Sequence, residues 1–204
     1  MATFSPVVVA DDRAPALTWA FEIKGGLFEP DLPMYKEFYG SDEDGYFGVA
    51  FTYQFREWLE VGGELGYMQD SGVGILQESN SPGGKVQYTL VPAHLFVTFR
   101  GRFGANPLLT PYVGGGITSA YYKQDIDSQS NRSGRTDLGF NARAGVRLDL
   151  TRFDRRAPKS GASSGLVNTY IFLEGQYFTT EVDDIDLGGI AYLLGFRFEF
   201  DYID

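Results

Sequence analysis

The residues of this chain that could do chemistry are few. His94 is the single histidine, and cysteine is absent. A serine–histidine hydrolase needs a serine beside its histidine, but Phe96 stands two residues on. One histidine and no cysteine also leave few ligands for a catalytic metal. We therefore expect no catalytic residue, no metal and no other cofactor, and we interpret His94 as a side chain that lines an interior.

Acidic and basic residues also recur at close, regular spacing. Glu60 and Glu64 form one pair, and Arg143 and Arg147 form another. Two carboxylates can hydrolyse a glycoside, but their role as partners for the two arginines is the better interpretation. The run Gly114–Gly116 is not a phosphate-binding loop, because no helix follows it and no Lys-Ser/Thr pair completes it.

The segment 190–202 indicates which kind of element positions these charges. Its even positions are large and apolar, from Ile190 to Tyr202, and its odd positions are mostly small or charged. Alternate side chains of a strand point to opposite faces, so this segment is a strand with one aromatic face. The same division recurs in eight candidate strands, at 17–28, 46–55, 59–68, 85–100, 109–122, 138–150, 167–177 and 190–202.

Segment 85–100 changes phase. Its apolar residues lie at even positions up to Leu90 and at odd positions from Ala93. Pro92, which cannot donate to a strand ladder, lies at the change. We expect a β-bulge near Val91–Pro92 that restores a single apolar face.

The bulk composition favours strands and excludes several classes. Aromatic residues make up 16% of the chain and there are 26 glycines, a mixture typical of strands joined by turns. The net charge of −10 argues against a nucleic-acid partner. A spanning helix is not expected, because no apolar run approaches the length of about 18 residues that one needs.

The polar faces of the strands distinguish a membrane barrel from a soluble one. A soluble lipocalin-like barrel turns its apolar face inward around a ligand and carries many charges outside. Here the polar face is mostly Gly, Ala, Asn and Gln, which suits a narrow lumen better than a water-exposed surface. Long and short connections alternate, as in bacterial barrels. The sequence thus predicts an all-β fold, an eight-stranded antiparallel up-and-down transmembrane β-barrel, with a lipocalin-like ligand-binding barrel as the alternative.

Charged residues on the inward face should neutralise one another, because an unpaired buried charge is costly. The expected lumen charge network consists of Glu22, Lys24, Glu60, Glu64, Arg143, Arg147, Asp149, Glu174, Arg197 and Glu199. Aromatic residues gather near both strand ends, as expected for two interfacial girdles. The acidic long loops are interpreted as solvated, with divalent-cation binding as the alternative.

Three segments resemble the small eight-stranded outer-membrane barrels of the OmpA and OmpW types. They are YTLVPAHLFVTFRGRF at 88–103, LTPYVGGGITSAYY at 109–122 and YLLGFRFEF at 192–200. The resemblance implies an integral protein of the bacterial outer membrane, in contact with outer-membrane lipids and lipopolysaccharide. It also implies a closing strand that the insertion machinery reads through Phe196, Phe198, Phe200 and Tyr202, although the last residues 201–204 depart from signals that end on the aromatic residue.

The expected role is a non-enzymatic monomer that acts as a structural or surface protein or as a small-solute channel. An outer-membrane enzyme that modifies lipid is the alternative. Residues 1–16 are expected to be a flexible segment, without a whole signal peptide, and residues 17–204 a single barrel domain. The stretched connection 151–165, rich in Arg, Ser and Gly, is expected to be a linker, with contact to an acidic partner or lipid headgroups as the alternative.

Overall fold

A computed structural model describes residues 18–31, 44–75, 82–101, 107–126, 132–152, 165–182 and 185–201. These residues contain no helix long and apolar enough to span a membrane. The eight long strands are β1 (Thr18–Pro30), β2 (Asp44–Arg56), β3 (Leu59–Ile75), β4 (Pro82–Arg100), β5 (Leu109–Ile126), β7 (Gly139–Asp149), β8 (Leu166–Phe178) and β11 (Gly189–Asp201). The short strands are β6 (Arg132–Arg135), β9 (Glu181–Val182) and β10 (Ile185–Asp186).

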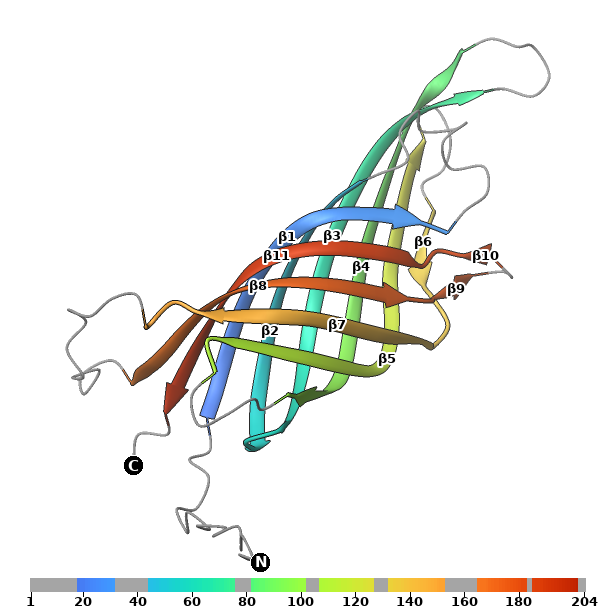
Figure 1. The fold of residues 1–204 in the computed structure, drawn as a ribbon. Coiled ribbons are helices and arrows are strands. Elements are labelled where there is room, and N and C mark those ends of the chain that lie inside the picture. Colours follow the sequence, from blue (N-terminus) through green and yellow to red (C-terminus); the bar gives the residue numbers. More distant parts are fainter. Residues whose placement is uncertain are drawn as a thin grey trace, which may run out of the picture.

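The eight long strands close into one antiparallel barrel (Figure 1). Each strand pairs with its neighbour in the chain. The first strand, β1, also pairs with the last, β11. Phe21 on β1 pairs with Phe51 on β2, which pairs with Gly63 on β3. Following paired residues in this way around the whole barrel leads back to β1 near Pro30 and not to Phe21, so the strands are staggered and tilted. The predicted eight-stranded up-and-down barrel is confirmed.

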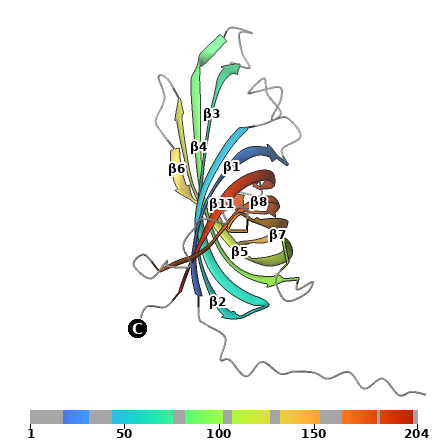
Figure 2. The same ribbon diagram turned by 60° about the vertical axis from the view of Figure 1, so that its left-hand side comes forward.

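Three adjacent strands are longer than the sequence predicts. β3 continues beyond Met68, β5 continues beyond Tyr122, and β4 begins before Lys85. Figures 1 and 2 show β3 and β4 rising past β1 and β11 at the end where the long connections lie. The bounds expected for these strands, 59–68, 85–100 and 109–122, are therefore too short. Polar residues beyond these bounds pair as strands outside the barrel wall, where alternation of apolar residues is not required.

The outer face of the barrel is apolar over most of its height. Large side chains at alternate positions of every long strand are exposed, among them Phe21, Phe51, Leu65, Leu95, Val113, Phe140, Leu173 and Leu194. A water-soluble protein rarely exposes a continuous apolar surface of this extent. This arrangement is the one required by a barrel whose outer wall contacts acyl chains.

The bulge expected near Val91–Pro92 is wrong. Leu65 pairs with Ala93 and Met68 pairs with Leu90 in one unbroken register, and β4 also pairs with β5 without a shift. The even positions of β4 from Leu90 to Thr98 therefore all point inward, and Leu90 is only 1% exposed. The expectation failed because it assumed a polar inner face at every level, whereas this level of the lumen is apolar.

Candidate functional site in the barrel interior

Six charged side chains meet in the lower part of the lumen, toward the short turns, and are called the lower cluster: Glu22, Glu60, Arg100, Arg147, Arg197 and Glu199. Arg197 lies at its centre. Its guanidinium donates to Glu22 at 2.6 Å, to Glu60 at 2.8 Å and to Glu199 at 2.9 Å. Three carboxylates face three guanidinium groups, so the cluster is electrically balanced.

The remaining arginines of the lower cluster bridge the same acids. Arg147 donates to Glu60 at 3.1 Å and to Glu22 at 3.4 Å. Arg100 lies 3.0 Å from Glu60 and 3.3 Å from Glu199. Each acid thus has more than one cationic partner, which is how buried charge is compensated when water is excluded.

A second group lies above the first and is called the upper cluster: Lys24, Glu64, Arg143 and Glu174. Lys24 Nζ lies 2.6 Å from Glu64 and 2.6 Å from Glu174, and Arg143 donates to Glu64 at 2.8 Å. Two acids again face two cations. Two tyrosine hydroxyls complete the cluster, because Tyr46 donates to Glu64 and Tyr112 donates to Glu174, each at 2.8 Å.

Aromatic rings pack against the guanidinium planes of two of these arginines. The Arg143 guanidinium carbon lies 3.6 Å from the centre of the Phe96 ring, and that of Arg147 lies 4.3 Å from the centre of the Tyr112 ring. Such contacts favour a guanidinium over an ammonium, since the planar group stacks on the ring. The two clusters are thereby held in fixed geometry.

An apolar plug fills the lumen above the upper cluster. Its members are Phe28, Tyr46, Met68, Leu90, Ala120, Phe178, Ala191 and Leu193. The Phe28 and Phe178 rings, from β1 and β8 on either side of β11, stack with centroids 5.2 Å apart. Buried side chains therefore occupy successive levels of the interior, which is the arrangement of a packed barrel and not of an open pore.

His94 lies between the upper cluster and the apolar plug. Its Nδ1 is 2.7 Å from the hydroxyl of Thr118, and its ring meets the Phe178 ring edge-on. With the Gln176 amide oxygen turned toward it, His94 Nε2 lies 3.2 Å from that oxygen. These neighbours place His94 inside the lumen, away from the lipid-facing wall on which a lipid hydrolase would act.

The structure places all but one of the ten predicted lumen charges in the two clusters. The exception is Asp149, which is half-buried and accepts a hydrogen bond from the backbone of Thr151 at 2.9 Å. Sequence reasoning missed Arg100, which ends the candidate strand 85–100 but was not included among the expected lumen charges. Arg100 shares the even phase of His94 and Thr98 on β4, and that phase was the available signal.

The predicted insertion-signal residues lie on the closing strand. Phe196 is exposed on the outer wall, and Phe198 and Phe200 are half-exposed on the same face. Tyr202 lies outside the described residues, as do residues 1–16 and most of 151–165. Within the described ranges, no group of three or more His, Asp or Glu side chains is placed to hold a metal ion.

Comparisons with known proteins agree with this geometry. Among solved structures, the fold is similar to Neisserial surface protein A, with 10% identity, 91% of this chain and 97% of that one covered, and a TM-score of 0.55. It is also similar to the outer membrane protein OprG from Pseudomonas aeruginosa, with 15% identity, coverage of 92% and 99%, and a TM-score of 0.56. At these identities the likeness concerns the fold alone.

The sequence itself carries the family assignment. No curated protein matches the sequence. Residues 18–198, almost the whole barrel, match the family described as "Outer membrane protein beta-barrel domain". The chain therefore belongs to this family and is an integral β-barrel protein of the bacterial outer membrane.

Proposed function

We propose that the chain is a non-enzymatic surface protein whose barrel anchors an extended sheet outside the membrane, and that solutes do not pass along its axis. The observation that carries this proposal is the filled lumen. The two balanced clusters and the apolar plug occupy it at successive levels. A permeating ion would have to break buried ion pairs, which costs several kcal/mol by order of magnitude.

The extended sheet is the feature that would meet the surroundings of the cell. The last pair between β2 and β3 is Tyr46 with Met68, and β3 continues to Ile75, paired with β4. Seven further residues reach about 20 Å beyond that point. In bacterial barrels the short turns face the periplasm, so this projection is assigned to the outside.

Single-channel recording in planar bilayers tests the absence of an axial path. The purified barrel should give no discrete conductance steps at high voltage, while a conducting porin measured in the same membranes gives clear ones. Reproducible steps from the wild-type barrel would overturn the proposal and favour the small-solute channel.

The absence of enzymatic activity is tested separately. His94 contacts Thr118 and Phe178 inside the lumen, so we expect wild-type protein to leave the acyl chains and phosphates of lipid A unchanged. Mass spectrometry of lipid A after incubation with the protein in vesicles measures this. Release of a fatty acid by wild type and its loss in His94→Ala would instead support the lipid-modifying enzyme.

We also propose that the closing strand directs assembly and that the barrel is a monomer. Phe198 and Phe200 lie on the outer face at the end of β11, where the insertion machinery would meet them. Replacing both with Asn should lower insertion by that machinery more than spontaneous folding into detergent. A closed barrel has no free edge in the membrane for a second copy to pair with, so cross-linking in membranes should yield no dimer.

A further inference from the structure

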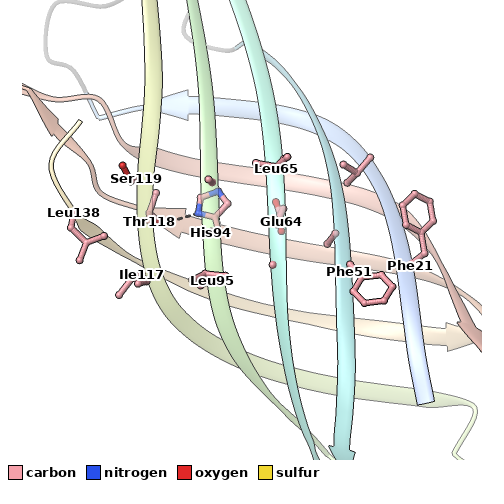
Figure 3. Close-up of a pocket in the computed structure, with 14 residues that line it drawn as sticks. Phe21, Phe51, Glu64, Leu65, His94, Leu95, Ile117, Thr118, Ser119 and Leu138 are labelled. Carbon is pink, nitrogen blue, oxygen red and sulfur yellow. Dashed lines mark hydrogen bonds between the residues drawn. The ribbon is translucent and has the colours of Figure 1, made fainter. Parts of the chain in front are cut away.

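The outer wall of the barrel is hollowed across β1 to β5. The hollow has a volume of about 480 Å³. Its floor is made by small outward-facing residues, Gly63, Ala93 and Ser119, and larger apolar side chains surround it: Phe21, Phe51, Leu65, Leu95, Ile117 and Leu138. Figure 3 shows most of these side chains on neighbouring strands, with Leu138 beside Ile117 and Ser119. At this level of the wall the surroundings are acyl chains.

Two cationic side chains lie just beyond this hollow, on the side of the long connections. Lys123 follows Ser119 by four positions on the same face of β5. Arg135 of β6 pairs directly with Tyr121, and opposite residues of an antiparallel pair share a face. Successive residues on one face of a strand are about 7 Å apart. The cations therefore lie at headgroup height, and the hollow lies below them.

Both cations are available to an anion. Arg135 is exposed and has no ion-pair partner among the described residues. Lys123 lies 2.6 Å from Asp125, with its side chain 45% exposed. A lysine ammonium has three donors, so it can hold Asp125 and a phosphate together. The chain as a whole carries a net charge of −10. The cationic pair Lys123 and Arg135 is a local exception, and it is complementary to an anionic headgroup.

We propose that this surface binds lipopolysaccharide, with a lipid A phosphate at Lys123 and Arg135 and an acyl chain in the hollow beneath. The position of the site in the membrane indicates which lipid occupies it. The site faces the membrane leaflet next to the long connections, which is the outer leaflet, and lipopolysaccharide is the phosphate-bearing lipid of that leaflet. One lipopolysaccharide molecule can place a phosphate at the two cations and an acyl chain in the hollow, because the cations and the hollow are adjacent. The proposal does not depend on the lumen being closed.

The opposite side of the barrel supplies an internal control. A second hollow of about 420 Å³ lies there, lined by Gly25, Gly145, Gly175 and neighbouring apolar residues. Beyond it on the outer face of β1 come Leu27 and then Glu29, which pairs with Ile190. An acid at headgroup height repels phosphate. This second hollow should therefore accept acyl chains in general, without a preference for a phosphorylated lipid.

Native mass spectrometry of the folded barrel, titrated in detergent with bis-phosphorylated or dephosphorylated lipid A, tests the proposal. Wild type should bind the phosphorylated form at least about tenfold more tightly, since each basic group near an anionic lipid surface contributes roughly fivefold. Lys123→Gln with Arg135→Gln should lose this preference. Gly63→Leu, which fills the hollow, should weaken binding of both forms.

Two variants are the matched controls. Arg56→Gln removes an exposed arginine at the opposite end of the barrel, and Gly175→Leu fills the second hollow. Both should keep the wild-type preference for phosphorylated lipid A. A Cβ at Gly63 or Gly175 meets no atom closer than 3.6 Å, which is ordinary van der Waals contact, so neither replacement begins with a clash. The heat-dependent shift of folded barrels on gels verifies folding.

Three results would overturn the proposal: equal binding of the two lipid A forms by wild type, equally tight binding of phosphatidylglycerol, or a loss in Gly175→Leu as large as in Gly63→Leu. The comparison of lipids on wild-type protein stands even if a variant does not fold. If lipid A did not bind, the expected absence of conductance steps would be unaffected. If conductance steps appeared, the proposed lipid A site would be unaffected.

Discussion

Arg197 and Glu22 face each other across the seam where the last strand meets the first. They are register partners between β11 and β1, with Arg197 Nη1 2.6 Å from Glu22 Oε1, although 175 positions separate them in the chain. The same guanidinium reaches Glu60 on β3. One buried side chain thus joins the closing strand to its neighbour and to the wall across the lumen. Closure of the barrel and neutrality of its interior therefore depend on the same residue.

The first prediction concerns that residue. Arg197→Met should lower the free energy of unfolding by about 3–5 kcal/mol, because removal of one partner leaves buried carboxylates uncompensated. Equilibrium unfolding by urea in lipid vesicles measures the change. Arg197→Lys, which keeps the charge but cannot donate to three acids with one planar group, should lose less.

A double variant separates the charge effect from the packing effect. Adding Glu22→Gln to Arg197→Met removes one of the uncompensated acids, so stability should recover in part. If the double variant were less stable than the sum of the two single changes, or if Arg197→Met alone cost almost nothing, the lower cluster would not stabilise the closed barrel.

The second prediction concerns the apolar plug. Phe178 stacks on Phe28 and touches His94, so Phe178→Ala should cost about 3–5 kcal/mol through lost contact and the cavity left behind. Leu173→Ala, on the outer face of the same strand, is the control. Lipid can fill the space it leaves, so its cost should be clearly smaller. Equal losses in urea unfolding would contradict the assignment of Phe178 to a packed interior.

Much of the fold was predictable because a barrel wall obeys one rule at every strand. Arg143 and Arg147 alternate with small outward residues, and the same phase places Glu60 and Glu64 inward. Leu90 shows where the rule stops. Alternation indicates which residues share a face, but the polarity of that face depends on height in the lumen, and height depends on the stagger between strands. The stagger is a property of pairings between distant segments, so the plug was not visible in the sequence.

Individual ion pairs are harder to predict from a sequence than the strands that carry them. The pairing of Glu64 with Arg143 and of Glu60 with Arg147 follows from equal spacing along two strands. The participation of Arg100, by contrast, depends on where β4 ends relative to β11. Tyr46 was missed for a similar reason: it lies near the start of β2, and only the structure brings its hydroxyl to Glu64.

The third prediction concerns the hydroxyl of Tyr46. Tyr46→Phe should lower the free energy of unfolding by about 1.5–3 kcal/mol, the range for a hydrogen bond to a charged group. Tyr67→Phe is the control, because the Tyr67 hydroxyl donates to Gln69 at an exposed site and water replaces that bond. If urea unfolding gave the same small loss for both variants, Tyr46 would not be needed to complete the upper cluster.

The fourth prediction concerns Gly116, within the run Gly114–Gly116. A Cβ on Gly116 would lie 1.8 Å from the carbonyl oxygen of Leu95, so the two strands approach too closely for any side chain there. Gly116→Ala should therefore shift or break the pairing of β5 with β4 and lower the yield of folded barrel, measured by heat-dependent gel migration and circular dichroism. Gly63→Ala adds the same methyl group on the outer wall, where the nearest atom is 3.6 Å away, and should fold like wild type. Normal folding of Gly116→Ala would mean that β4 and β5 lie farther apart than described.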